Sequence, residues 1–375
     1  MEFTAGGRLE VRITPSDVGK RVSVRRLDDG GGPVTGFTDT VGVLTSWNGG
    51  VLVITRRDGG MVRIAENVLV AGKVVPAAPA RRRGPAAHYA ELARVAARAW
   101  QPVESERLGD WELRAAYEEA PGAASAETPG AASAETPGAA SAEASGAGRP
   151  WRRRAGFTRR ANSVLPLGDP GRPLDDALAR VRRWYAERGL PAYVQTATGA
   201  EGTQELLCAG LVERGWQREV SAELRVGGLA PVGDLDADTG RVLLSRNVDD
   251  AWLGRYQRTG VPGPRARQVL AAGPSVWFAA VPAADGPPAA IGRCVVDGRW
   301  AGFMAVEVDP ARRREGLATA VMTALARRAL DEGASAAWLQ VEEDNGGARA
   351  LYDGMGFAVH HSYHHYREPD DNGGG

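Results

Sequence analysis

The chain has 375 residues, which exceeds the size of one ordinary hydrophobic core and predicts two or three domains. Its 46 acidic and 46 basic side chains give no net charge, so the composition provides no overall attraction to nucleic acid or to an anionic membrane. The sequence contains no apolar run of about 18 residues and does not begin with a signal-peptide pattern. We therefore expect a cytoplasmic protein.

Two residue types indicate the cellular context. The two cysteines, Cys208 and Cys294, lie far apart without a metal-binding spacing, so we expect reduced thiols in the core. Arginine provides nearly all of the basic side chains, with Lys20 and Lys73 as the exceptions. Together with the abundant alanine and glycine, this bias is typical of a high-GC bacterial genome and carries no information on mechanism.

The first region, residues 10–76, is predicted to be all β. Short alternating runs are separated by Asn48-Gly49 and Asp58-Gly59, dipeptides that readily form two-residue hairpin turns. About five short strands in about sixty residues predict a small SH3-like β-barrel. Residues 77–85, which include three consecutive arginines at 81–83, are predicted to be a linker.

The middle region begins with an amphipathic helix at residues 86–100 and a strand at residues 111–116. Residues 119–149 follow, where the sequence PGAASAET is repeated. Their small side chains bury too little area to offset the entropy of ordering, so we expect a disordered loop inserted between two strands.

After this insert, the predicted elements are a strand at 156–165, a helix at 174–188, a strand at 192–196, a helix at 204–214 and a strand at 221–226. The last third repeats this order, with a strand at 303–308, a helix at 317–330, a strand at 337–341, a helix at 348–355 and a closing strand. We therefore interpret residues 86–228 as a degenerate half-copy of residues 241–368. The alternative is an unrelated α+β domain with the same order of elements. Residues 369–375 are predicted to be a disordered tail.

The strongest functional signal lies in residues 308–320, which read VDPARRREGLATA. A strand ends at Pro310, a basic loop follows, and Gly316 opens a long apolar helix. A helix N-terminus exposes unpaired N–H groups and the positive end of the helix dipole, so it binds anions. Glycine lets the backbone approach a phosphate, and Arg313 and Arg314 add positive charge. The alternative is a solvated loop before an ordinary helix.

A second motif lies downstream, where residues 345–357 follow the order Asn-x-x-Ala-x-x-Leu-Tyr-x-x-x-Gly-Phe. Together with the loop motif Arg-x-x-Gly-x-Ala at residues 313–318, it resembles the GNAT superfamily of N-acetyltransferases. The whole chain is similar to actinobacterial proteins that join an SH3-like domain to a GNAT domain, some of them described as histone-type acetyltransferases. The resemblance implies a mixed α/β fold, with a mostly antiparallel GNAT sheet flanked by helices.

The resemblance also implies acetyl-CoA as co-substrate, no metal, and direct attack of an amine on the acetyl carbonyl in a ternary complex. Tyr352 would donate its phenolic proton to the departing thiolate. Val306 and Val308 would pair with the pantetheine arm of CoA, beside a bulge that splays their strand. Asn345 would contact the pantetheine or fix the loop. The pyrophosphate would be held by Arg313, Arg314, Glu315, Gly316, Leu317, Ala318 and Thr319.

The reaction also needs a base, because a lysine-type amine with a pKa of about 10.4 is mostly protonated at pH 7. Glu307 is the candidate, since it lies in the middle of the strand beside the expected slot. The alternative is that Glu307 faces water. Glu342 and Glu343, at the end of the following strand, are weaker candidates.

A cluster of histidines near the end of the chain consists of His360, His361, His364 and His365. Their alternation favours strand packing or lining of the acceptor site over metal binding, because no cysteine or paired carboxylate completes a set of ligands. The middle region lacks both the Arg-x-x-Gly-x-Ala loop and the tyrosine, so we expect no cofactor there.

The preferred function is an acetyl-CoA-dependent N-acetyltransferase that acts on a protein lysine, a protein N-terminus or a small-molecule amine. The alternative is a non-catalytic adaptor that senses acetyl-CoA and acts through the SH3-like domain. Contact with nucleic acid through residues 81–83 is a third and weaker hypothesis. The sequence leaves open the acceptor and the choice between monomer and homodimer.

Overall fold

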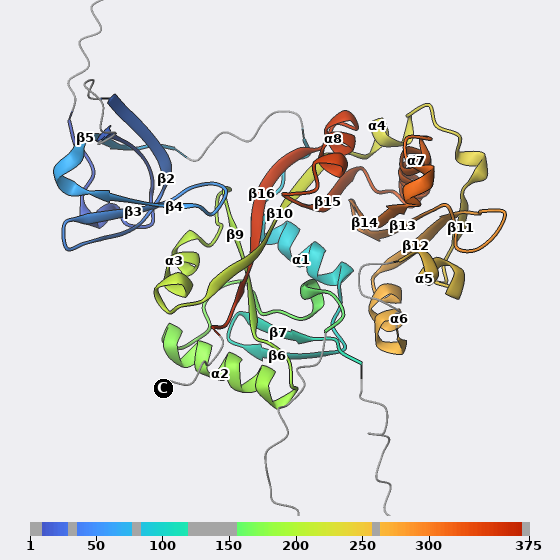
Figure 1. Ribbon diagram of the computed structural model, residues 1–375, viewed down its shortest axis with the longest axis horizontal. Coiled ribbons are helices and arrows are strands. Elements are labelled where there is room, and N and C mark those ends of the chain that lie inside the picture. Colours follow the sequence, from blue (N-terminus) through green and yellow to red (C-terminus); the bar gives the residue numbers. More distant parts are fainter. Residues whose placement is uncertain (1–9, 29–35, 77–83, 119–155, 257–262, 370–375) are drawn as a thin grey trace, which may run out of the picture.

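The computed structural model describes residues 10–28, 36–76, 84–118, 156–256 and 263–369. Most of the expected linker, the low-complexity insert and nearly all of the expected tail lie outside these ranges. In chain order, the described residues form an N-terminal sheet, a middle segment (residues 84–228) and a C-terminal segment (residues 229–369) (Figure 1).

The N-terminal sheet has five antiparallel strands in the order β4-β3-β2-β1-β5. The hairpin predicted at Asn48-Gly49 is present between β2 and β3, but its turn residues are Gly49 and Gly50, with φ angles of 58° and 74°, because Asn48 still pairs with Val51. Among the described residues, no backbone pairing joins the edge strands β4 and β5, so the closed barrel stays a prediction. The strands are β1 (Arg21–Asp28), β2 (Gly36–Asn48), β3 (Val51–Thr55), β4 (Met61–Ala65) and β5 (Leu69–Val74).

The rest of the molecule is built on an eight-stranded sheet in the order β11-β12-β13-β14-β15-β10-β16-β9. Its neighbouring strands are antiparallel except for the parallel pair β14 and β15. The strands are β9 (Tyr193–Thr198), β10 (Gln217–Gly228), β11 (Leu243–Ser245), β12 (Ser275–Val281), β13 (Ala290–Asp297), β14 (Trp300–Val308), β15 (Ala336–Glu342) and β16 (Ala358–Arg367).

A small sheet with the order β6-β7-β8 continues this large sheet beyond β9. A parallel bridge between Val164 and Val194 makes the connection. The strands of the small sheet are β6 (Glu104–Leu108), β7 (Trp111–Ala115) and β8 (Leu165–Pro166). The helices are α1 (Tyr89–Ala99), α2 (Leu174–Glu187), α3 (Glu205–Glu213), α4 (Leu229–Gly233), α5 (Asp250–Arg255), α6 (Pro264–Ala271), α7 (Leu317–Asp331) and α8 (Gly346–Gly354).

The middle and C-terminal segments exchange their last strands. β10, which ends the middle segment, pairs with β15 of the C-terminal segment, whereas β16 pairs with β9 of the middle segment. β10 and β16 also pair with each other at the centre of the sheet. On either side of this pair the order strand, helix, strand, helix, strand is repeated, as β8-α2-β9-α3-β10 and as β14-α7-β15-α8-β16. Each segment therefore completes its sheet with a strand from the other.

Two apolar clusters cover opposite faces of the C-terminal sheet. Helix α7 packs on one face, and its buried side chains include Leu317, Val321 and Leu325. Helices α5 and α6 pack on the other face together with α1 of the middle segment. Glu91 on α1 accepts a hydrogen bond from Trp300 Nε1 at 2.7 Å. The middle segment thus contributes to the core of the C-terminal segment as well as to its sheet.

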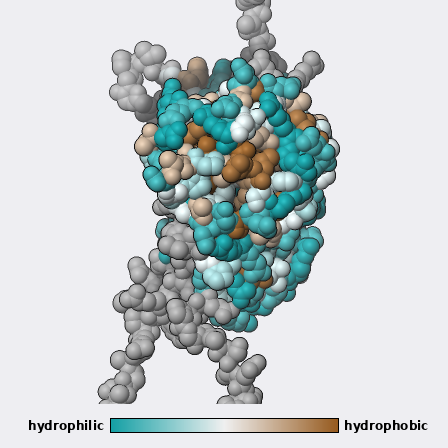
Figure 2. Space-filling view, turned by 90° about the vertical axis from the view of Figure 1, so that its right-hand side faces the viewer, coloured by the Kyte–Doolittle hydropathy of each residue, from teal (hydrophilic) through white to brown (hydrophobic). Residues whose placement is uncertain are grey.

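The free edge of the large sheet is the three-residue strand β11, on which Leu243 is 62% exposed. Figure 2 shows that this side of the molecule is mainly hydrophilic, with separate hydrophobic spots. A short edge strand of this kind offers little template for pairing with another chain. Within the described ranges, no helix combines the length and apolarity needed to cross a bilayer.

One predicted element is wrong. Residues 156–165 were expected to form a strand, but they contain the 3₁₀ turn Arg159–Ala161 and only the start of the two-residue β8. The buried Asn162 explains the difference, because its side chain bonds the backbone of Ala116, Phe157 and Thr158 at 2.8 to 3.0 Å. These bonds replace the ladder that a strand would have formed. β6 was not predicted.

Candidate functional site

Strand β14 bends away from β15 at a β-bulge. The parallel pairing of the two strands covers residues 300–303 and 336–339, and no pairing is described beyond Phe303. On the other side of β14, the register with β13 shifts between Ile291 and Arg293, and Ala305 takes a φ of 53°. Because a bulge places an extra residue in one strand and bends it, a gap opens between β14 and β15.

A narrow cavity of about 30 Å³, here called the slot cavity, lies in this gap. Tyr352 on α8 lines it and is only 9% exposed. Trp100 and Arg160 come from the middle segment. The lining residues are Trp100, Arg160, Tyr256, Phe303, Met304, Ala305, Val306, Trp338, Gln340 and Tyr352.

Three polar atoms of the slot-cavity residues are buried and lack a hydrogen-bond partner in the described part of the chain. They are Nε1 of Trp100, Nε1 of Trp338 and Oε1 of Gln340. Each unsatisfied buried group of this kind costs about 1–3 kcal/mol, so it marks a place where a ligand or water completes the site. The slot cavity is therefore suited to a thin ligand with both donor and acceptor groups.

The loop after β14 ends at the N-terminus of α7, where no side chain caps the first backbone N–H groups. Gly316 is the N-cap of α7 with a φ of 75°, and it offers no side chain to cap the first turn. Arg314 also has a positive φ, 70°. Arg313 and Arg314 are exposed and form no ion pair with a described residue. This arrangement provides both the amides and the charge of an anion site.

Ion pairs hold this loop in place. Arg312 bonds the Glu315 carboxylate at 2.8 Å and thereby lowers the pKa of Glu315. Asp309 accepts from the backbone N–H of Ala311 at 2.9 Å and from Arg255 at 2.6 Å, and both bonds lower the pKa of Asp309. Glu315 is thus paired within the loop, so its charge is partly compensated where an anion would approach.

The remaining residues that the sequence motifs indicate do not all line the slot cavity. Asn345 is the N-cap of α8 and accepts from Ala348 N at 3.1 Å, which fixes the start of the helix that carries Tyr352. Val306 lines the slot cavity. Glu307 and Val308 follow the bulge and pair with Ile291 and Ala290 of β13; neither is among the described residues that line the slot cavity.

The sequence pattern did not identify Trp100, Arg160, Tyr256 or Gln340 as slot residues. Trp100 and Arg160 precede the two motifs by more than a hundred positions, and no local pattern links them to the loop. The chemistry of the slot therefore depends on a part of the chain that carries no recognisable motif.

The Gly316 turn leads to a first prediction. Gly316→Ala is expected to weaken acetyl-CoA binding about tenfold or more, because the left-handed φ disfavours a Cβ and the added methyl group faces open space where a phosphate would approach. Calorimetric titration with acetyl-CoA measures the effect. Gly333→Ala is the matched control, since Gly333 follows the same helix with a φ of 90° and also faces open space. Equal losses in both variants would contradict the assignment.

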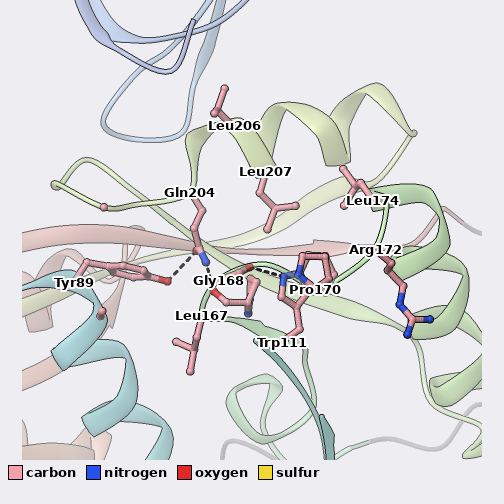
Figure 3. A pocket seen from close by; sticks show the side chains of 13 residues that line it. Tyr89, Trp111, Leu167, Gly168, Pro170, Arg172, Leu174, Gln204, Leu206 and Leu207 are labelled. Atoms are coloured by element: carbon pink, nitrogen blue, oxygen red, sulfur yellow. Dashed lines mark hydrogen bonds between the residues drawn. The ribbon is translucent and has the colours of Figure 1, made fainter. Parts of the chain in front are cut away.

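In the middle segment, the space between β8 and β9 corresponds to the gap between β14 and β15. The side chain of Gln204 bridges this space (Figure 3). Gln204, before α3, donates to the carbonyl of Pro166 on β8 and accepts from Ala197 N on β9 at 2.9 Å. Tyr89 donates to the same Gln204 oxygen at 2.9 Å. A cavity of about 420 Å³ remains beside these residues, lined mostly by apolar side chains such as Leu174. The absence of a cofactor from this segment stays a prediction, and the Gln204 bridge supports it.

Another cavity adjoins the slot cavity and lies between the middle and C-terminal segments. Its volume is about 390 Å³, and we call it the inter-segment cavity. Arg160 and Tyr256 line both cavities. Glu342, one of the alternative bases, lines it at the end of β15. The lining residues are Gly156, Thr158, Arg159, Arg160, Asn162, Leu190, Pro191, Tyr193, Val220, Tyr256, Glu342, Tyr363 and His365.

The histidines of β16 are packed into the sheet. His364 lies between Ser221 Oγ at 2.8 Å and Thr198 Oγ1 at 2.9 Å. His360 and His361 face each other through their Nδ1 atoms at 2.9 Å. The residues that the structure describes contain no group of three or more potential ligands placed to hold a metal ion. Strand packing accounts for His361 and His364, whereas His365 reaches the inter-segment cavity.

The parallel pair split by a bulge, with the basic loop and helix that follow it, is the arrangement that the GNAT resemblance implies. The chain belongs to the family described as "Probable histone acetyltransferase Rv0428c C-terminal", whose model matches residues 127–366. It is therefore an acetyltransferase-like protein, and this class implies use of acetyl-CoA.

Several solved structures are similar to part of the chain. A GCN5-related N-acetyltransferase from Kribbella flavida is 21% identical, with 56% of this chain and 82% of that chain covered and a TM-score of 0.40. A tandem GNAT protein from the clavulanic acid biosynthesis pathway is 14% identical, with 55% and 74% covered and a TM-score of 0.44. A GCN5-related N-acetyltransferase from Sphaerobacter thermophilus is 16% identical, with 55% and 72% covered and a TM-score of 0.40. No curated protein matches the chain.

Proposed function

We propose that the protein transfers the acetyl group of acetyl-CoA to an amine by direct attack in a ternary complex. The observation that carries this proposal is the gap between β14 and β15, which has Tyr352 at one wall and is bordered by β14, the strand that is followed by the open amides at Gly316. The pantetheine arm would lie along Val306 and Val308. The pyrophosphate would lie against residues 313–319.

Tyr352 is proposed to donate its phenolic proton to the CoA thiolate as the C–S bond breaks. A nearby O–H donor stabilises a thiolate leaving group, and a phenol stays protonated at neutral pH. The buried position of Tyr352 beside the bulge supports this role. The Nε1–H groups of Trp100 and Trp338 would donate to carbonyl oxygens of the arm, and Gln340 Oε1 would accept from an amide N–H of the arm.

Proton removal from the acceptor amine is proposed to involve a carboxylate. Glu307 is the candidate that the sequence indicates, and it follows the bulge on β14. Glu342 is the alternative, because it lines the inter-segment cavity that adjoins the slot. Either carboxylate could act directly or through a water molecule.

The rate of acetyl transfer by a Tyr352 variant tests the proposal. Tyr352→Phe is expected to lower kcat about 100-fold, while the Kd for acetyl-CoA changes by less than about threefold, because the hydroxyl acts on the leaving group and not on the bound arm. Thiol release with a panel of amines measures kcat, and Tyr117→Phe, at a tyrosine outside the slot cavity, is the control. The same assay on Glu307→Gln and Glu342→Gln separates the two bases. Unchanged turnover in Tyr352→Phe would contradict the role proposed for Tyr352, and acetyl-CoA binding without any turnover in the unmodified protein would favour the acetyl-CoA-sensing adaptor instead.

The domain organisation proposed with this function has an SH3-like region at residues 10–76 and a catalytic GNAT domain at residues 241–368. The N-terminal sheet contacts the exchanged strands directly. Arg57 donates to the carbonyl of Val359 at 3.0 Å, and Thr198 donates to the carbonyl of Arg57 at 2.7 Å. Arg218 donates to the carbonyl of Asp58 at 2.8 Å. These contacts support a fixed position for the N-terminal region beside β9, β10 and β16.

A further inference from the structure

Arg160 lies where the slot cavity meets the inter-segment cavity. Its Nε and Nη2 atoms donate to the Tyr363 hydroxyl at 3.1 and 2.7 Å, and its guanidinium lies over the rings of Trp100 and Tyr363. It forms no ion pair with a carboxylate of the described residues. The neighbouring Arg159 differs in this respect, because it pairs with Glu219 at 2.9 Å. Arg160 is therefore a positioned cation without an anion.

The inter-segment cavity also offers an unpaired carboxylate. Glu342 lines it, and its side chain makes no ion pair with Arg160 or with any other described cation. A guanidinium and a carboxylate that line one cavity but do not pair with each other fit a ligand that carries both charges. The volume of about 390 Å³ lies within the range of small-molecule sites.

His365 provides the second independent observation. It lines the same cavity, is only 2% exposed, and has no hydrogen-bond partner for either ring nitrogen among the residues described. A neutral imidazole has one donor and one acceptor, and leaving both unsatisfied in the interior is costly. A polar ligand in the inter-segment cavity would satisfy them.

On the basis of the proposed function, we propose that the acceptor is a small amino acid-like amine. Its carboxylate binds Arg160 and its amine lies toward the slot and Glu342. Arg160 lines the slot cavity itself, so the carboxylate and the reacting nitrogen must be separated by only a few bonds. The side chain of an internal protein lysine does not meet this condition, because its ε-amine has no carboxylate nearby.

The reaction balances with these groups. The amine nitrogen bonds to the acetyl carbon, the C–S bond breaks, and the products are an N-acetylated amino acid and the CoA thiol. A carboxylate takes the proton lost from the amine, and Tyr352 provides the proton gained by the thiolate. The positive charge of Arg160 also disfavours the protonated amine, which increases the fraction able to attack.

Matched substrate pairs test this inference. Thiol release from acetyl-CoA is measured with amino acids and with the amines that their decarboxylation yields, such as lysine and cadaverine or tryptophan and tryptamine. A lysine-containing peptide blocked at both ends completes the panel. For the preferred pair, we expect kcat/KM for the amino acid to exceed that of the amine by about 10- to 100-fold, the usual contribution of a charge-assisted bond.

Arg160→Gln is expected to reduce this ratio to near one, whereas Arg98→Gln, at an arginine that pairs with Asp297 and lines neither cavity, should keep it. Both rates in each ratio come from the same preparation, so partial unfolding does not change the result. A ratio near one in the unmodified protein, or acetylation of the peptide or cadaverine in preference to amino acids, would overturn the inference and leave the acetyltransferase function standing. Acetyl-CoA binding without turnover of any acceptor would overturn both.

Discussion

Residues 229–375 expressed without the middle segment are expected to remain unfolded and to bind no acetyl-CoA. In the intact chain, β10 lies between β15 and β16, so its removal leaves these two strands without their shared neighbour. Leu224 and Val226 of β10 also belong to the apolar cluster that contains Trp300 and Trp338. The fragment would thus lose a central strand and part of its core together.

Co-expression of residues 84–228 with residues 229–375 is expected to restore folding, because each fragment provides the strand that the other lacks. Circular dichroism and calorimetric titration with acetyl-CoA measure the outcome. Deletion of residues 1–76 is the control; since the N-terminal sheet has its own core, this deletion should leave acetyl-CoA binding intact. A monomeric, cooperatively folded fragment 229–375 that binds acetyl-CoA would show that the exchanged strand is dispensable.

Local features of the fold could be predicted because they depend on local physical chemistry. The helix at residues 317–330 and the turn at Gly316 follow from an apolar run and from a residue that tolerates positive φ, and the structure has both. The strand exchange could not be predicted in this way. The pattern of β16 indicates a packed strand but not its partners, and it gives no sign that both of its faces, including Ser362 and His364, are buried.

The residues of the candidate site also fall into two groups, those that sequence motifs identify and those that only the fold brings to the slot cavity. Val306 and Tyr352 belong to motifs within the C-terminal segment, and both line the slot cavity. Arg160 and Trp100 reach the slot cavity only because the two segments share one sheet and one core. The wrong strand at residues 156–165 has a related cause, because Asn162 bonds backbone groups that are distant in sequence, including those of Ala116.

Acid is expected to unfold the protein well before its carboxylates are protonated. His361, His364 and His365 are buried on β16, and burial lowers the pKa of each, for His364 to about 4. Between pH 6.5 and 4, the unfolded chain therefore binds protons that the folded chain does not. Stability is unaffected above pH 6.5 and falls below it by about 1.4 kcal/mol per pH unit for each such histidine. At pH 5.5 His364 alone would remove about 1.4 kcal/mol of the 5–15 kcal/mol that is typical of folded proteins, and the lowered pKa values of His361 and His365 act in the same direction.

The positively charged neighbours of these histidines also lower their pKa values, which supports the expected loss of stability in acid. Positive charges oppose protonation of all three, from Arg57 at His361, Arg218 at His364 and Arg160 at His365, whereas Asp58 partly favours protonation of His364.

Urea unfolding at pH 7.5, 6.5 and 5.5 measures how steeply the free energy of unfolding depends on pH. His364→Asn should reduce it by about one proton, and the exposed His88→Gln should leave it unchanged. A free energy of unfolding that stays constant from pH 7.5 to 5.5 would show that these histidines are protonated in the fold. Because all three lie on the strand shared by the two segments, we expect the loss of acetyl-CoA binding to follow the same pH profile.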